Sequence, residues 1–287
     1  MQYQAPANTA EAVKLLAENA GSARVLAGGT DLLVQMKSGL VSPGMIVDIK
    51  SIPGMRDVVA EAGGFRIGAA VSGAELGENA KVVAMWPGVV EAFELIGSTQ
   101  VQGRCTMAGN LCNASPAGDA VPAMVAAGAI ARIEGPSGQR DVPVQEVPIS
   151  PGKTSLKAGE FISSIFLPAQ AKSGGDAYLR FIPRTEMDIA VCSAGVNLTL
   201  DGSGKITTAR VSLGAVAPTV LLVADAAAAI IGTTLDDAAC AALKAAASEA
   251  ANPIDDKRGT VEFRKEVAGT LAVRAAKIAY ARAGGAK

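Results

Sequence analysis

Two segments of the sequence combine glycine residues with side chains that form hydrogen bonds. The first is LAGGTDLL, residues 26–33, where Gly28 and Gly29 follow a buried-strand pattern and precede a helical one. Such a turn presents free backbone N–H groups beside the positive end of a helix dipole, which favours a phosphate by roughly 0.3 to 1 kcal/mol per contact. Glycine lets the main chain approach the anion closely. The same pair also fits a plain turn between a strand and a helix.

The second segment is TMAGNLCNASPAGD, residues 106–119, and core-like sequence flanks it on both sides. It supplies hydroxyl, amide and carboxylate groups, together with glycines that allow close backbone approach. These residues are Thr106, Gly109, Asn110, Ser115, Gly118 and Asp119. We expect both segments to be loops, and two such loops fit a long ligand with a charged middle better than two unrelated turns.

The composition excludes several kinds of chemistry. The chain has no histidine, which removes imidazole metal sites, Ser-His-Asp catalysis and a histidine general base. Its four cysteines include no C-x-x-C pair, so we expect no zinc site, iron–sulfur cluster or other metal site on this chain. A net charge of -1 and 3% aromatic residues provide neither a basic face nor a stacking platform for nucleic acid.

The common nucleotide-binding fingerprints are absent from the sequence. The spacing around Gly28 and Gly29 is neither G-x-G-x-x-G nor that of a P-loop. The segment PGKTSL, residues 151–156, lacks the upstream glycine of a P-loop because Val147 occupies that position. A nucleotide site in this chain therefore needs a different architecture.

Length and hydropathy limit the number of domains and the kind of protein that the chain can form. At 287 residues and 49% hydrophobic content, the chain can bury a substantial core in two domains or three small ones. No apolar run reaches the roughly 18 residues of a membrane span, and MQYQAPANTAEAV lacks a basic segment followed by an apolar one. We therefore expect a cytoplasmic protein without a membrane span.

Alternating strand and helix patterns occupy the first 50 residues. They predict a first helix, capped by Asn8 and Glu11 and ended by Gly21, and then a strand at 23–27. A second helix, capped by Thr30 or Asp31 and ended by Gly39, and a strand at 45–49 are predicted to follow. This order is typical of a small parallel sheet. From residue 58, two alternating runs across Gly63 and Gly64 predict a hairpin and the start of antiparallel sheet.

The remaining patterns predict two further parts of the chain. Helices are expected over 89–96 and within DAVPAMVAAGA, followed by strands and by a long hairpin that turns at 201–204. An alanine-rich helical region follows, from about Thr219 to Arg282. We place the boundaries near Pro53 and in the polar segment 170–176, which gives domains 1–53, 54–175 and 176–287.

Taken together, these motifs resemble the FAD-binding medium subunit of the molybdenum hydroxylases, the family of xanthine dehydrogenase and carbon monoxide dehydrogenase. The resemblance covers essentially the whole chain, from the EAVKLL helix through both glycine-bearing segments and RFIPRTEMDIAV to the C-terminal helices. It implies an α+β protein with the FAD-binding fold of the PCMH (vanillyl-alcohol-oxidase) type. In that fold a small parallel βαβ subdomain and an antiparallel subdomain precede a C-terminal domain with a small antiparallel sheet and helices.

The resemblance also implies which residues hold FAD. The first segment would wrap the pyrophosphate, two residues would line the flavin, and the second segment would bind the diphosphate, ribityl and adenosine parts. These implied cofactor residues are Val25, Leu26, Ala27, Gly28, Gly29, Thr30, Asp31 and Leu32, then Ile96 and Gly97, then Thr106, Gly109, Asn110 and Asp119.

Residues of the C-terminal part are implied to lie near the flavin ring. Arg180 matches a position that is often basic in relatives, and a solvated arginine at a strand end is the alternative. The segment with Arg184, Glu186 and Asp188 matches a loop beside the flavin, although the sequence alone describes an exposed turn. Relatives carry glycine at the position of Ala108, so a positive φ there would strain the alanine.

As a family member, the chain would pass electrons to a terminal acceptor through its FAD, with no residue of its own catalysing substrate hydroxylation. A large molybdopterin-binding subunit and a small subunit with two [2Fe-2S] clusters would be its partners, in a dimer of heterotrimers. Without a cysteine-rich insertion, the chain itself would carry flavin only. Gly-Gly-Thr-Asp, where carbon monoxide oxidising members have Gly-Gly-His-Ser, makes carbon monoxide the less favoured substrate. A stand-alone FAD oxidoreductase and a non-enzymatic scaffold are the alternatives.

Overall fold

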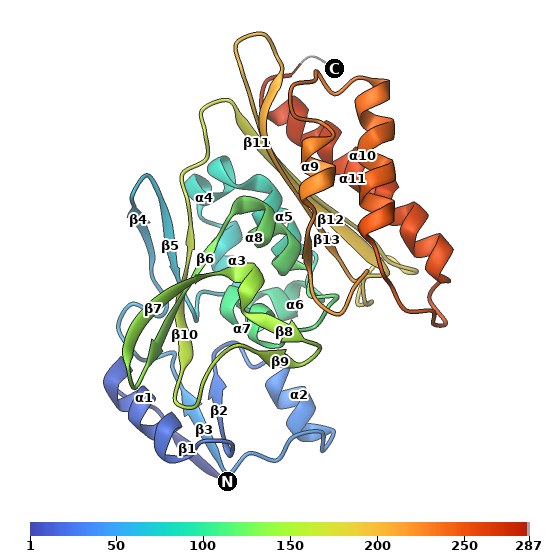
Figure 1. Cartoon of the computed structure of the whole chain (residues 1–287). Helices are drawn as coiled ribbons and strands as arrows, with labels where there is room; N and C mark the ends of the chain where they lie inside the picture. The colour runs from blue at the N-terminus through green and yellow to red at the C-terminus, as the bar shows by residue number, and fades with distance from the viewer. Residues whose placement is uncertain (286–287) are drawn as a thin grey trace.

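The computed structural model describes residues 1–285, and its N-terminal part folds around a three-stranded parallel sheet (Figure 1). In chain order its elements are β1 (Gln2–Gln4), α1 (Thr9–Glu18), β2 (Ala23–Leu26), α2 (Leu32–Lys37) and β3 (Met45–Asp48). The Asn8 side chain accepts a hydrogen bond from the Glu11 N–H, as the capping pattern predicts. The predicted capping of α2 is wrong in detail: Asp31 occupies the N-cap position but makes no side-chain capping bond.

A five-stranded antiparallel sheet forms the middle of the molecule, in the order β4-β5-β10-β6-β7. Its strands are β4 (Val58–Glu61), β5 (Gly64–Gly68), β6 (Ile130–Gly135), β7 (Gly138–Pro143) and β10 (Phe161–Leu167). The predicted hairpin is present, with its turn one residue earlier, at Ala62 and Gly63. β10 is central because it returns from the far end of the segment to pair with both β5 and β6.

Short helices and a small hairpin connect the strands of this middle sheet. The helices are α3 (Gly73–Gly77), α4 (Ala80–Met85), α5 (Pro87–Glu94), α6 (Thr99–Gln102), α7 (Met107–Cys112) and α8 (Ala120–Ala127). Before β10 come the 3-10 turn Val144–Glu146 and the hairpin of β8 (Pro148–Ser150) and β9 (Lys153–Thr154). Every residue of α8 is buried, which is expected of a helix that is apolar on all sides.

The C-terminal part is a four-stranded antiparallel sheet with helices. Its elements are β11 (Gly174–Phe181), β12 (Cys192–Leu200), β13 (Ile206–Gly214), β14 (Leu221–Leu222), α9 (Ala224–Ala228), α10 (Asp237–Ala250) and α11 (Val261–Arg282). The predicted helical region from Thr219 is therefore partly wrong, because Leu221 and Leu222 pair with β13. The expected linker at 170–176 ends inside β11, where Gly174 and Gly175 pair with β12.

The C-terminal sheet has helices on both of its faces (Figure 1). Alternate residues of β11 belong to different cores: Ala177 belongs to the core of the C-terminal part, whereas Tyr178 belongs to the core of the middle part. Gly195 of β12 and Ser212 of β13 approach the Pro122 carbonyl of α8 from the same side as Tyr178. The sheet is thus the layer that joins the N-terminal two thirds of the chain to its C-terminal helices.

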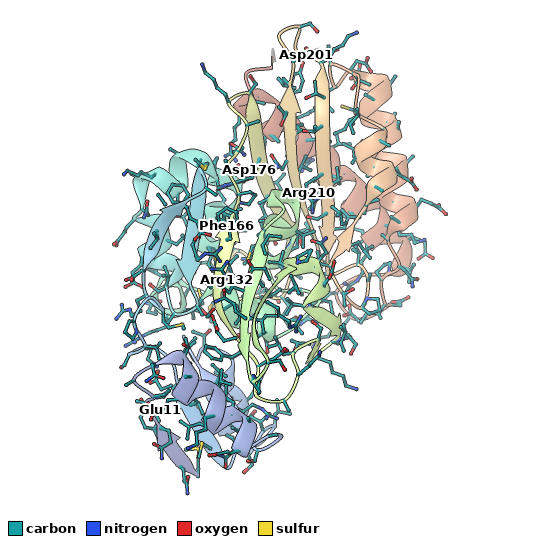
Figure 2. The ribbon with its side chains drawn as sticks, turned by 60° about the vertical axis from the view of Figure 1, so that its left-hand side comes forward. Glu11, Arg132, Phe166, Asp176, Asp201 and Arg210 are labelled. Atoms are coloured by element: carbon teal, nitrogen blue, oxygen red, sulfur yellow. The ribbon has the colours of Figure 1, made fainter. Side chains whose placement is uncertain are left out.

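Two charged side chains of this sheet, Asp176 and Arg210, form hydrogen bonds with the ends of two helices in the middle part; Figure 2 labels both residues. Asp176 of β11 accepts a hydrogen bond from the Val89 N–H, 3.1 Å away, at the start of α5. Arg210 of β13 donates to the Val125 carbonyl oxygen, 2.9 Å away, near the end of α8. A carboxylate at a helix N-terminus and a guanidinium at a C-terminus both complement the helix dipoles.

A third polar contact across this junction is the ion pair of Asp119 and Arg180, 2.6 Å apart. The Tyr178 hydroxyl donates to the same carboxylate at 2.9 Å. Both charged side chains are nearly inaccessible to solvent, so each depends on the other to offset the cost of burying its charge. Burial raises the pKa of Asp119 to about 6, while Arg180 and Tyr178 oppose that rise.

No helix among residues 1–285 has the length and apolar character that crossing a membrane requires.

The β4–β5 turn generates a prediction about stability. Ala62 has φ +49° and Gly63 has φ +78°, the signs that a type I′ turn requires, and alanine adopts such a φ at a cost of roughly 1–2 kcal/mol. Asparagine is favoured at this position, so Ala62→Asn should raise the free energy of unfolding by about 0.5–1 kcal/mol in urea. Ala62→Val, with a β-branched side chain, should lower it; stability that is the same in all three proteins would contradict the assigned turn.

The Asp119–Arg180 pair predicts a destabilisation that depends on pH. Because the folded pKa of Asp119 lies above the unfolded value of about 3.9, the stability associated with this group is lost as the pH rises towards about 6. In Arg180→Met the interaction that lowers the pKa of Asp119 is gone, so this pKa rises further. The loss of stability with rising pH should therefore extend to a higher pH than in the original protein. We expect a cost of at least about 2 kcal/mol at pH 8 and a clearly smaller one at pH 5.

Thermal unfolding at both pH values measures this effect. Arg184→Met is the matched control, because that arginine is exposed and its substitution should change stability little at either pH. A cost for Arg180→Met that is equal at pH 5 and pH 8 would refute the coupling to Asp119.

Candidate functional site

A cavity of about 530 Å³ lies where the two glycine-bearing segments meet, within the range of roughly 300–1,000 Å³ typical of ligand pockets. Its wall consists of the turn after β2 with α2, the start of α7, and the segment from β9 to β10. The structure thus brings together most of the predicted cofactor residues. Those on the wall are Val25, Ala27, Gly28, Gly29, Thr30, Asp31, Leu32, Ile96, Thr106, Gly109 and Asn110.

The two glycines of the first segment serve different purposes. A Cβ at Gly28 would lie 1.9 Å from the Arg104 carbonyl oxygen, so this glycine allows close approach to the chain itself. Gly29 has φ +80°, a left-handed conformation that only glycine adopts without strain, and it turns the chain into α2. Within residues 1–285, the N–H groups of residues 29–31 donate to no other residue. They are free donors at the cavity wall.

The sequence predicts that the second segment is a loop, and this is wrong in part, because the helix α7 forms within it. The Thr106 hydroxyl accepts a hydrogen bond from the Gly109 N–H at 3.0 Å and caps this short helix. A Cβ at Gly109 would meet only that hydroxyl, at 2.8 Å, with open space otherwise. The side-chain amide oxygen of Asn110 accepts a hydrogen bond from the Ala120 N–H and so fixes α7 relative to α8. Gly109 therefore exposes bare backbone to the cavity.

The strain considered for Ala108 occurs elsewhere in the segment. Ala108 lies within α7 and is not among the residues with positive φ. Ala114 has a positive φ, +49°, although its side chain is buried and only 2% exposed. Alanine in place of the glycine that relatives carry therefore causes no backbone strain at position 108. The residue in a left-handed conformation is Ala114, which follows α7.

Four predicted cofactor residues do not line the cavity. Leu26 packs beneath Gly29, and Gly97 turns the chain with φ +61°. Asp119 and Arg180 are paired with each other at the junction described above. Their contact with a cofactor stays a prediction.

The predicted flavin-adjacent loop also lies outside the cavity wall, after β11. Arg184 donates to the Asp188 carboxylate at 3.0 Å. The hydrogen bond from the Ile189 N–H, together with the hydrogen bond and the positive charge of Arg184, holds the pKa of Asp188 below its usual value. Glu186 is exposed, as an exposed turn predicts. The pair Arg184 and Asp188 therefore orders this loop, and its position beside a flavin stays a prediction.

Several wall residues were missed by sequence reasoning. They are Arg24, Gln35, Cys112, Asn113, Gly152, Thr154 and Lys157. Gly152 and Thr154 belong to PGKTSL, whose glycine and polar residues were a signal even though its spacing is not that of a P-loop. Burial raises the pKa of the Cys112 thiol to about 12, which disfavours the reactive thiolate form. Within residues 1–285, no cluster of three or more histidine, cysteine or acidic side chains could hold a metal ion.

Two protein-family models match successive parts of the chain. Residues 1–170 match the FAD binding domain in molybdopterin dehydrogenase. Residues 177–279 match the CO dehydrogenase flavoprotein C-terminal domain. The matched ranges correspond to the two sheets of the N-terminal and middle parts and to the sheet and helices of the C-terminal part.

Whole-chain relatives agree with both models. The carbon monoxide dehydrogenase medium chain of Afipia carboxidovorans is 33% identical, over 98% of this chain and 97% of its own. The xanthine dehydrogenase FAD-binding subunit of Escherichia coli O157:H7 is 30% identical over 99% and 97%. A crystal structure of the Cu,Mo-CO dehydrogenase superposes with a TM-score of 0.94 at 33% identity, covering 98% of each chain. The chain belongs to the FAD-binding medium subunits of the molybdenum hydroxylase family.

Proposed function

We propose that the cavity between the two glycine-bearing segments holds the FAD, with its diphosphate against residues 28–31 and 106–110. The observation that carries this proposal is that segments 75 or more residues apart in sequence form the wall of one cavity. The N–H groups of residues 29–31 are available there to donate to phosphate oxygens. Gly109 leaves space for a ligand against its backbone.

The charges on the cavity wall suit different parts of the dinucleotide. Asp31 carries a carboxylate that repels phosphate, so it is better placed to accept hydrogen bonds from ribose or ribityl hydroxyls. Desolvation raises the pKa of this carboxyl group above its usual value. Arg24 and Lys157 are cations on the same wall and complement the two phosphate charges.

The chain is the FAD subunit of an oxidoreductase complex and works with a large molybdenum-binding subunit and a small iron–sulfur subunit. When bound, FAD accepts electrons from one-electron carriers and passes them on to a terminal acceptor. The residues of this chain bind the cofactor and orient it, and we assign none of them to substrate hydroxylation. We further propose a dimer of heterotrimers in the cytoplasm. Under this proposal, the stand-alone oxidoreductase and the scaffold are the less favoured alternatives.

Under this proposal, the substrate site lies on the large subunit. The medium-chain relatives come from both carbon monoxide and xanthine dehydrogenases. The expectation that carbon monoxide is the less favoured substrate rests on Thr30 and Asp31 in the first segment and stays a prediction.

Gly109 offers the most direct test of this site. In Gly109→Val the new Cβ would lie 2.8 Å from the Thr106 hydroxyl, which must shift, and the methyl groups enter the otherwise open space against which the diphosphate is proposed to lie. We expect the dissociation constant for FAD to rise at least about tenfold, since overpacking of this kind costs about 1–3 kcal/mol. Flavin absorbance of the purified protein and titration with added FAD measure the effect.

Gly103→Val is the matched control. This glycine is exposed, lies outside the cavity wall, has φ -65° and leaves ordinary contact distances for a Cβ. Both variants should retain the far-ultraviolet circular dichroism of the original protein. If Gly109→Val binds FAD as tightly as Gly103→Val, the cofactor does not lie against this backbone.

A further inference from the structure

One side chain joins the two glycine-bearing segments across the cavity wall. The Asn113 amide nitrogen donates to the Asp31 carboxylate at 3.1 Å, and its carbonyl oxygen accepts from the Gln35 amide at 3.0 Å. All three residues line the cavity. We propose that Asn113 is a positioning residue that holds the Gly28–Gly29 turn and α2 in place and so sets the width of the diphosphate site. This inference rests on the proposed FAD site.

The α2 side of this bridge has little else to hold it. None of the six residues of α2 is buried, and Leu33 and Val34 are 52% and 63% exposed. A helix this short is marginal without packing of an apolar face. The Asp31 carboxylate, which could have capped α2, bonds to Asn113 instead. The position of α2 therefore depends strongly on these two hydrogen bonds.

The Asn113 side of the bridge, by contrast, is fixed. Its own N–H donates to the Gly109 carbonyl oxygen at the end of α7. The next residue, Ala114, is buried in a left-handed conformation, and its carbonyl oxygen accepts from the Gly152 N–H at 3.1 Å. A conformation that costs energy persists only where the surroundings determine it. Asn113 is thus the anchor and α2 the held element.

An amide is the group that the two partners require at position 113. Asp31 offers only acceptors, whereas the Gln35 amide group donates, so one side chain must present a donor and an acceptor together. In Asn113→Asp the bond from Gln35 is kept, but two carboxylates face each other where a hydrogen bond was. In the double variant Asp31→Asn, Asn113→Asp both bonds can form again, with the direction of the first reversed.

Tryptic cleavage after Lys37 measures how firmly α2 is held, because Lys37 is an exposed residue of that helix. In the full-length chain without added FAD, we expect Asn113→Asp to be cleaved there about three to ten times faster than the original protein. The double variant should return to within about twofold of the original rate. Thr154→Asp, which adds the same charge to the same wall at a residue outside α2 and α7, controls for electrostatics and should also stay within about twofold.

The outcomes separate this inference from the proposed site. Equal cleavage of Asn113→Asp and the original protein would overturn it, and so would a double variant cleaved as fast as Asn113→Asp. Titration with FAD is the second readout: the dissociation constant should rise for Asn113→Asp and recover in the double variant. If the original protein binds no FAD, the proposed site fails, but the order of the cleavage rates still decides whether Asn113 holds α2.

Discussion

The candidate site depends on one close contact between two parts of the backbone. At Gly28 the chain passes so near the Arg104 carbonyl oxygen that a Cβ would lie 1.9 Å from it. This contact brings the end of the parallel sheet against the segment that leads into α7, although the two are far apart in sequence. The free N–H groups of residues 29–31 and the bare backbone of Gly109 then face one cavity. A larger residue at position 28 would force the walls of this cavity apart.

The rest of the fold keeps these two segments in register. Thr106 caps α7, and Asn110 connects α7 to α8. α8 is buried between the middle part and the C-terminal sheet, where Arg210 bonds to its last turn and Asp119 at its N-cap pairs with the sheet. Up to residue 285, the C-terminal part contributes no residue to the cavity wall, but it fixes the helices that carry the second segment.

Sequence reasoning found the architecture and the segments, but not the contacts between side chains. Long elements with a clear period, such as the parallel βαβ order and the β12–β13 hairpin, were predictable, whereas short helices such as α3 and α6 show too little periodicity. Sequence patterns describe which groups are present, so they place Asp119 at a ligand, which stays a prediction, and only the fold shows that this carboxylate also pairs with Arg180. Asn113 was missed because its partners, Asp31 and Gln35, are about 80 residues away in sequence.

A crystal structure of the chain with FAD tests the central claim most directly. We expect density for the diphosphate within hydrogen-bonding distance of the N–H groups of residues 29–31, with Gly109 in van der Waals contact on the opposite wall. FAD bound elsewhere on the chain, with this cavity filled only by water, would contradict it.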